Sequence, residues 1–180
     1  MAAKLVVPYE KYLYSYLDAC RDFKKHNITS FGDNPDTFDT WKHTIFQRLA
    51  NNRLGIDLPS GYVPASTFWL VENDEFIGIG SIRHRLTESL ERFGGHIGYA
   101  IRCDKWGMGY GTVQLNLLLK EAAILGIKRT LITCDESNIA SARVIEKNGG
   151  VYQDTIDNII DDKPRRTKRY WASTSNKLAL

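Results

Sequence analysis

The sequence predicts one α/β (α+β) domain built on a mixed, mostly antiparallel sheet with flanking helices. Helical periodicity dominates the N-terminal segment, and a change to strand-like alternation follows it. The C-terminal half then reads as strand, helix, strand, helix, strand, strand. No linker-like stretch interrupts this order, so a single domain is expected over residues 1–180.

Composition bounds the class of protein. The chain has 43% hydrophobic and 25% charged residues, which is typical of a globular protein. A net charge of +3 argues against a dedicated nucleic-acid binder. Cys20, Cys103 and Cys134 are far apart and form no CxxC pair, which argues against a disulfide framework or a zinc site. This cysteine pattern indicates a reducing cytosol, and no apolar run is long enough to span a bilayer. A cytoplasmic protein with no metal and no membrane or nucleic-acid partner is therefore expected.

The first half is expected to hold a short strand and two amphipathic helices. Residues 4–7 form the strand, which Pro8 stops. Apolar residues recur at helical spacing over residues 9–26 and again over residues 36–50. Two prolines and two glycines mark residues 54–66 as a loop.

A hairpin is expected next, because the period changes to alternation. Its strands span residues 66–73 and 76–86 around the turn dipeptide Asn73-Asp74. A loop over residues 87–95 and a strand over residues 96–103 follow. The remaining elements are expected at 113–126 (helix), 128–134 (strand), 137–150 (helix capped by Ser137 or Asn138), 151–160 and 167–173 (strands joined by a charged turn at 161–166).

A basic run, Arg83-His84-Arg85, lies on the second hairpin strand. Alternation would put Arg83 and Arg85 on one face and His84 on the other. The run either is a solvated strand end or lines a cleft for an acidic acceptor molecule.

Three glycines lie between a predicted strand and the predicted helix that follows it: Gly107, Gly109 and Gly111. The N–H groups at a helix start bind anions, and glycine lets phosphate oxygens approach them. The alternative is a tight turn without a ligand. A dinucleotide fold is a competing hypothesis, with Asp135 as its ribose-binding acid, but Thr112 stands where the third fingerprint glycine belongs.

Two motifs carry a family resemblance. Residues 97–122, "IGYAIRCDKWGMGYGTVQLNLLLKEA", resemble the acetyl-CoA motif of the GNAT acetyltransferases. Residues 134–150, "CDESNIASARVIEKNGG", are similar to the family's next motif. The Trp-Gly-x-Gly-Tyr pattern is similar to the branch of the ribosomal-protein N-terminal acetyltransferases and to uncharacterised bacterial GNAT proteins.

The resemblance implies a GNAT fold in which two parallel neighbours of the sheet splay apart around acetyl-CoA. The strand before the glycines would bind pantetheine, the glycine loop would bind the pyrophosphate, and the next helix would face the thioester. Lys147 is a weaker candidate for contact with the thioester end of the cofactor, because a lysine at a helix C-terminus is often only solvated. The implied cofactor-binding residues are Ala100, Ile101, Arg102, Trp106, Gly107, Met108, Gly109, Tyr110, Gly111, Thr112, Asn138 and Ser141.

The resemblance also indicates candidate catalytic residues. Many members carry Glu as a base where this chain has His96, whose ordinary pKa near 6.5 suits a base. The alternative is a histidine hydrogen-bonded at a strand start. Many members carry Tyr as the acid where this chain has Ile145, so Ser141 is the matched hydroxyl, with Tyr99 a weaker candidate. Cys134 is expected to be a core thiol.

The predicted function is transfer of an acetyl group from acetyl-CoA to a primary amine in a ternary complex. The acceptor is a small molecule or a protein N-terminus, and the oligomeric state is open, with a homodimer as one option. A catalytically weak acyl-CoA sensor is the first alternative. A nicotinamide-binding oxidoreductase is the second, and the strand order and Thr112 disfavour it.

Overall fold

A computed structural model describes residues 2–28, 31–160 and 162–174. Their strands form one seven-stranded sheet in the order β1-β2-β3-β4-β5-β7-β6. Neighbours are antiparallel except for β4 and β5, which are parallel. The strands are β1 (Lys4–Val6), β2 (Ala65–Glu72), β3 (Glu75–Arg83), β4 (Ile97–Ile101), β5 (Arg129–Asp135), β6 (Val151–Ile160) and β7 (Lys163–Ser173). The mixed, mostly antiparallel sheet is confirmed.

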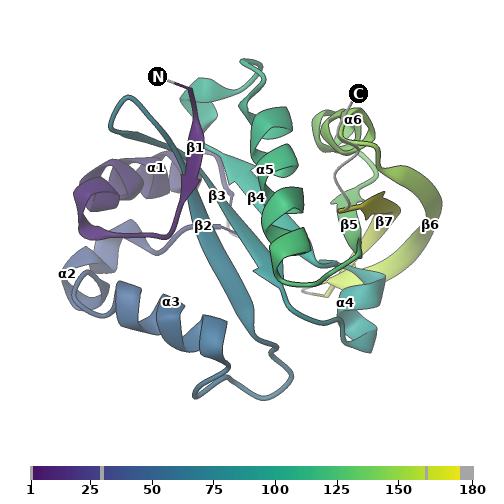
Figure 1. Cartoon of the computed structure of the whole chain (residues 1–180), viewed down its shortest axis with the longest axis horizontal. Helices are drawn as coiled ribbons and strands as arrows, with labels where there is room; N and C mark the ends of the chain where they lie inside the picture. Colours follow the sequence, from purple (N-terminus) through teal and green to yellow (C-terminus); the bar gives the residue numbers. More distant parts are fainter. Residues whose placement is uncertain (1, 29–30, 161, 175–180) are drawn as a thin grey trace.

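Helices flank the sheet in two groups (Figure 1). The first three lie together beside the N-terminal strands, whereas α5 crosses the middle of the sheet and α6 lies beside β5. The helices are α1 (Leu13–Lys25), α2 (Phe38–Trp41), α3 (Ile45–Leu54), α4 (Glu88–Arg92), α5 (Tyr110–Ile124) and α6 (Ile139–Lys147). Short 3₁₀ helices span Glu10–Tyr12, Pro35–Thr37 and Cys103–Lys105.

Alternation along β2 divides the core between the two faces of the sheet. Phe68 packs in a cluster with Leu115 and Leu118 of α5. Trp69, the next residue, packs in a second cluster with Tyr16 and Phe23 of α1. Because successive side chains of a strand point to opposite faces, α1 and α5 cover opposite sides of β2.

Three predicted elements differ from the structure. The helix predicted at 36–50 is divided, because the backbone N–H of Thr44 bonds the carbonyl of Trp41 and closes a turn before α3 begins. The predicted loop at 87–95 contains α4, whose N-terminus is capped by the Thr87 hydroxyl, which accepts the N–H of Leu90. The strand predicted at 76–86 ends at Arg83.

The tail hairpin is also tighter than predicted. The structure starts β7 at Lys163, and Pro164 lies opposite Ile159 within the ladder. Most of the charged stretch predicted as a turn is therefore strand. Residue 161, part of that predicted turn, is outside the described residues.

The sheet opens between its parallel neighbours. Ile97 and Ile132 are the single aligned pair of β4 and β5, although each strand continues beyond it. Antiparallel neighbours elsewhere in the sheet stay paired over most of their length. The two parallel strands are therefore splayed, as the family resemblance implied, and the splay leaves room between β4 and β5 near Tyr99.

Candidate active site

The first cavity lies along the glycine loop and has a volume of about 720 Å³. We call it the glycine-loop cavity. Its walls come from the end of β4, the loop, the start of α5 and one side of α6. The predicted cofactor-binding residues that line it are Ala100, Ile101, Trp106, Gly107, Gly109, Tyr110, Gly111, Thr112, Asn138 and Ser141.

The loop keeps its backbone open toward this cavity. Gly107 and Gly109 have positive φ angles of 76° and 87°, which L side chains rarely adopt. A Cβ added to either residue would meet no protein atom within 4 Å, so the space beside them is open. Gly109 is also the N-cap of α5, whose first N–H groups are available to an anion.

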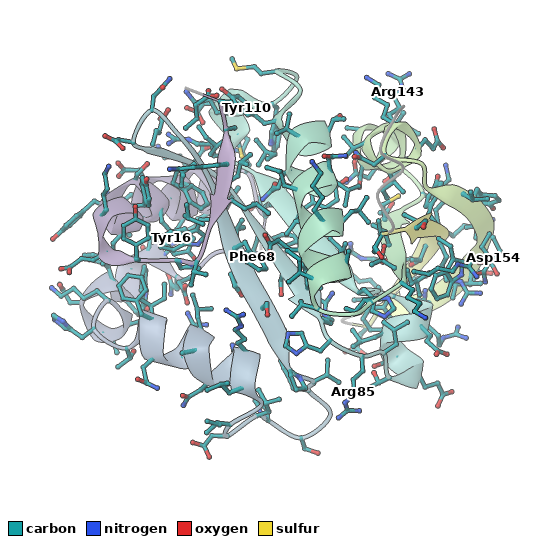
Figure 2. All side chains as sticks on the ribbon, in the orientation of Figure 1. Tyr16, Phe68, Arg85, Tyr110, Arg143 and Asp154 are labelled. Carbon is teal, nitrogen blue, oxygen red and sulfur yellow. The ribbon has the colours of Figure 1, made fainter. Side chains whose placement is uncertain are left out.

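The charged residues that line the glycine-loop cavity are all cations. They are Lys105, Arg143 and Lys147. Arg143 and Lys147 are four residues apart on α6 and therefore share a helix face, and Figure 2 shows the Arg143 side chain extending outward from that helix. Lys105 is paired with Glu75 at 3.0 Å. A glycine loop with cations around it suits a ligand that carries several phosphates.

Two predicted cofactor-binding residues do not line this cavity. The Arg102 guanidinium bonds Glu75 at 2.9 Å and Asp104 at 2.6 Å, so its side chain is committed to an ion-pair network. Met108 is exposed at the tip of the loop. Their backbone atoms remain adjacent to lining residues, but their side chains have no place in the site.

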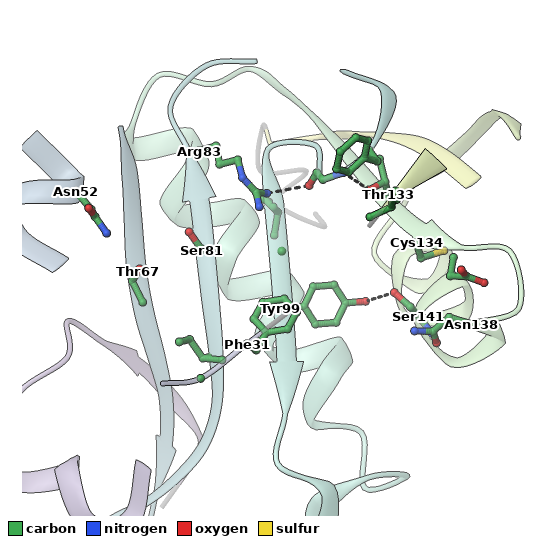
Figure 3. A pocket seen from close by; sticks show the side chains of 18 of the residues that line it. Phe31, Asn52, Thr67, Ser81, Arg83, Tyr99, Thr133, Cys134, Asn138 and Ser141 are labelled. Atoms are coloured by element: carbon green, nitrogen blue, oxygen red, sulfur yellow. Dashed lines mark hydrogen bonds between the residues drawn. The ribbon is translucent and has the colours of Figure 1, made fainter. Parts of the chain in front are cut away.

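The second cavity lies against the middle of the sheet, and we call it the central cavity. It has a volume of about 650 Å³ and is lined from β2, β3, β4 and β5, with α3 at one side. Its polar lining residues include Asn52, Thr67 and Ser81, which Figure 3 shows on neighbouring elements. An aromatic residue, Phe31, belongs to both cavities.

The two cavities meet at a pair of hydroxyl groups. Tyr99, Asn138 and Ser141 line both cavities. The Tyr99 ring reaches from β4 across the gap toward α6 (Figure 3), and its hydroxyl lies 3.1 Å from Oγ of Ser141. Burial raises the pKa of Tyr99 to about 12, so the phenol keeps its proton at neutral pH. The pair can therefore donate a hydrogen bond to an atom placed at the junction.

His96 lies apart from this junction. It is 8% exposed, lines neither cavity, and its Nδ1 accepts the backbone N–H of Leu131 at 2.9 Å. A neutral imidazole has one acceptor nitrogen, and here that nitrogen is already used. The geometry therefore does not support the prediction of His96 as the base. It supports the alternative, a histidine that extends the β4–β5 ladder.

The position of His96 predicts how stability depends on pH. Burial, with a smaller effect of Arg83, lowers the pKa of His96 below 6.5. Between that lowered value and about 6.5 the unfolded chain binds more protons, so the free energy of unfolding falls as the pH falls below about 6.5. Urea denaturation between about pH 5.5 and pH 7.5 should show this loss.

A His96→Gln variant provides the control, because its amide oxygen can still accept the Leu131 N–H. The variant is expected to lose part of the pH dependence. Burial lowers the pKa of His84 as well, so the part of the pH dependence that His84 causes remains. Equal pH slopes in the two proteins would contradict this account of His96.

Asn138 holds Ser141 in place. It is the N-cap of α6, and its Oδ1 accepts the backbone N–H of Ser141 at 3.0 Å. The prediction that Ser137 or Asn138 caps this helix is thus narrowed to Asn138. The cap fixes the first turn of α6, and with it the side of the helix that faces Tyr99.

We expect Asn138→Ala to lower the free energy of unfolding by about 1 kcal/mol, because the cap is lost. Asn138→Ser keeps a side-chain acceptor and should retain most of the stability. Parallel urea titrations of the two variants measure the difference. If alanine and serine are equally stable, the cap contributes nothing.

Cys134 is 8% exposed at the end of β5, where it lines the central cavity. Burial raises the pKa of its thiol. A protonated, buried thiol is a poor nucleophile, so the expectation of a core thiol agrees with its environment.

One group of side chains has the composition of a metal site. Asp22, His26 and Cys103 each place a ligand atom within 4.8 Å of the others. Hydrogen bonds account for this cluster, because Asp22 accepts the backbone N–H of Cys103 at 2.9 Å and His26 Nδ1 lies 3.0 Å from the Asp22 carbonyl oxygen. The cluster ties α1 to the segment before the glycine loop.

Sequence reasoning missed Phe31, Lys105 and Arg143. Phe31 lies in a connection between helices, where no periodicity marks it. The spacing of Arg143 and Lys147 on one helix face was the signal that could have identified both as a cationic wall.

Comparison with solved structures finds this fold in several acetyltransferases. RimJ of Mycobacterium smegmatis in complex with CoA-disulfide is 17% identical with a TM-score of 0.73, over 99% of this chain and 84% of that chain. RimL, a ribosomal L7/L12 α-N-protein acetyltransferase in complex with coenzyme A, is 20% identical with a TM-score of 0.69, over 96% and 94%. MccE, a microcin C7 self-immunity acetyltransferase in complex with acetyl-CoA and AMP, is 17% identical with a TM-score of 0.67, over 95% and 92%.

At these identities the likeness establishes the fold. The family model described as acetyltransferase (GNAT) domain matches residues 21–151. The chain therefore belongs to the GNAT acetyltransferase family, as its motifs predicted. The comparison with curated protein sequences found no match. Among the helices of the described residues, none combines the length and the apolar character that crossing a bilayer requires.

Proposed function

We propose that the protein transfers an acetyl group from acetyl-CoA directly to a primary amine in a ternary complex. The observation that carries this proposal is that the two cavities meet at the Tyr99–Ser141 pair. Donor in the glycine-loop cavity and acceptor in the central cavity come together at these hydroxyl groups. Both substrates can then be bound before any bond changes.

The donor assignment rests on the chemistry of the glycine-loop cavity. Open backbone at Gly107 and Gly109 suits a pyrophosphate, and Arg143 and Lys147 add positive charge. The named GNAT structures that hold acetyl-CoA or coenzyme A share this fold. Acetyl-CoA supplies the acetyl group and the phosphates that this cavity is built to hold.

At the junction, the neutral amine nitrogen of the acceptor attacks the carbonyl carbon of the thioester. A nitrogen–carbon bond forms, the carbon–sulfur bond breaks, and its electron pair leaves on the sulfur of coenzyme A. The Tyr99–Ser141 pair donates a hydrogen bond to the sulfur as negative charge grows there. The proton released by the amine ends on the thiol, so coenzyme A and the N-acetylated amine are the products.

Cys134 supports direct transfer over an acyl-enzyme route. Its thiol is buried with a raised pKa, and no activating base is described beside it. The acceptor amine is thus the only nucleophile that the proposed mechanism needs.

The proposal is tested by calorimetry with acetyl-CoA, coenzyme A and NAD, followed by a thiol-release assay over a panel of primary amines. Tight binding of acetyl-CoA with amine-dependent thiol release is the expected result. Acetyl-CoA binding without release from any amine would favour the sensor alternative. Binding of NAD in place of acetyl-CoA would overturn the proposed function.

A further inference from the structure

Arg83, at the end of β3, brings an uncompensated positive charge to the central cavity. Its Nη1 donates to the carbonyl oxygens of Gly94 at 2.9 Å and Gly95 at 3.1 Å, and Figure 3 shows the side chain reaching in from the strand end. Within the described part of the chain, no carboxylate lies within 4.0 Å of the guanidinium. The two backbone carbonyls orient the guanidinium but do not neutralise its positive charge.

The other charged residues that line the central cavity are paired. Arg48 bonds Asp33 at 2.6 Å, and Arg165 lies 4.0 Å from Asp135. These pairs cancel, so Arg83 leaves the described lining with one net positive charge. A cavity of this kind favours a ligand with one negative charge and disfavours a polycation.

The positive charge lies close to the proposed reaction centre. A Cβ built on Gly98 would be 3.8 Å from Nη1 of Arg83 and 3.4 Å from Phe31. Gly98 has no side chain, so the space between Arg83 and Phe31 stays free. Tyr99 is the next residue of the same strand, and it lines the central cavity together with Arg83 and Gly98.

We propose that the acceptor is a small primary amine that also carries a carboxylate, and that Arg83 binds this carboxylate. The inference rests on the proposed function and names the substrate class of the central cavity. An α-amino acid has its amine and carboxylate on one carbon and is the simplest acceptor of this class. A protein N-terminus has an amide in that position, and spermidine carries further positive charge.

Arg83 binds a planar carboxylate better than a lysine would, because its guanidinium offers several N–H donors in one plane. With Nη1 engaged by Gly94 and Gly95, the remaining N–H groups are free for the ligand among the described contacts. The neighbouring Arg85 is exposed beyond the end of β3 and lines neither cavity; Figure 2 shows it far from Arg143 and α6. Of the basic run, it is therefore Arg83 that lines the central cavity, where an acidic acceptor would bind.

The test compares amino acids with their amides as acceptors in the thiol-release assay. L-alanine and L-phenylalanine are paired with L-alaninamide and L-phenylalaninamide, and spermidine is the cationic probe. We expect kcat/KM to be at least about tenfold higher for the acids. The amides have the less basic and more readily neutral amine, so a preference for the acids cannot come from amine reactivity.

Arg83→Gln should raise KM for the acids by about tenfold or more and leave the amides unchanged, with acetyl-CoA affinity retained. Arg83→Lys should restore part of the preference, and the control Arg85→Gln should behave as wild type. A merely structural role for Arg83 would change acids and amides alike. The wild-type comparison needs no variant, so a misfolded Arg83→Gln protein does not remove the test.

A second arm needs no turnover. Calorimetry measures N-acetyl-L-phenylalanine and its amide against the protein saturated with coenzyme A. Preference for the amide or for spermidine in the rate assay, or equal binding of acid and amide, would overturn the inference. If the protein then still binds acetyl-CoA and releases thiol with some amine, the proposed acetyl transfer stands and only the substrate class is wrong. If it neither binds acetyl-CoA nor releases thiol, the proposed acetyl transfer is wrong as well.

Discussion

Ser141→Ala and Tyr99→Phe are each expected to lower kcat by about a hundredfold, because each removes one hydroxyl from the pair that faces the leaving sulfur. Acetyl-CoA affinity should change little, since one hydrogen bond to a neutral thioester contributes about 0.5–1.5 kcal/mol. The help appears in the transition state, where charge develops on sulfur. Accordingly, kcat and kcat/KM should fall together.

The double variant is the sharper measurement. Because the two hydroxyl groups are joined in one hydrogen bond, they act as a unit, and the double variant should lose little more than either single variant. Independent roles would instead multiply the two losses. Stability is recorded on the same preparations by urea denaturation.

Tyr152→Phe is the matched control. Its hydroxyl lies 2.9 Å from Oγ1 of Thr155 on the exposed strand β6, so the variant removes a similar hydroxyl pair outside both cavities. It should keep wild-type turnover. Full activity in Ser141→Ala would remove this hydroxyl from the reaction and leave water to protonate the thiolate.

The second large effect is expected in the glycine loop. Gly109→Val should weaken acetyl-CoA binding by about tenfold or more, roughly 1.4 kcal/mol or above. The valine side chain would enter space that no protein atom occupies within 4 Å and that we assign to the pyrophosphate. Calorimetry with acetyl-CoA measures the loss.

Gly126→Val separates strain from blocking. Gly126 has a φ of +81° against +87° for Gly109, and a Cβ there also meets nothing within 4 Å. It follows α5 at the opposite end and lines neither cavity. Both variants place a valine at a similar positive φ, so loss of acetyl-CoA binding in Gly109→Val alone would come from blocking of the site. Equal affinities in the two variants would remove the phosphate role from the loop.

Local sequence determined what could be predicted of the site. The glycine loop and the capped helix after β5 are contiguous motifs, and their physical requirements are readable without a fold. The motif predicts backbone contacts for Arg102 and Met108, and it does not indicate where their side chains point. Arg102 turns away because two carboxylates attract it.

The catalytic assignment needed distances between elements. The sequence favours His96 over Tyr99 as a catalytic residue, because a tyrosine on an apolar strand is usually a core residue. Only the splay of β4 from β5 gives its ring a path to Ser141, and that splay is a tertiary feature. His96 was placed by analogy with a family position, and the backbone N–H of Leu131 uses its free nitrogen.

The helix α4 and the break before α3 were missed for another reason. Both involve a single threonine: the Thr87 hydroxyl caps α4, and the backbone N–H and hydroxyl of Thr44 both bond the carbonyl of Trp41. Such bonds outweigh weak propensities in short segments. They leave no periodic trace in the sequence.

The single aligned pair of β4 and β5 has a mechanical meaning. Backbone pairing joins β1, β2, β3 and β4 in one block and β5, β7 and β6 in another, but Ile97 and Ile132 are the single aligned pair between the two blocks. Hydrogen bonds between His96 and Leu131 lie next to that pair. The sheet thus consists of two blocks with little direct pairing between them, and Leu115 and Leu118 of α5 belong to a core cluster that includes Ile82 of the first block and Ile132 of the second. A donor molecule in the glycine-loop cavity lies between β4 of one block and α6, which follows β5 of the other, so its binding couples the two blocks and the release of coenzyme A uncouples them.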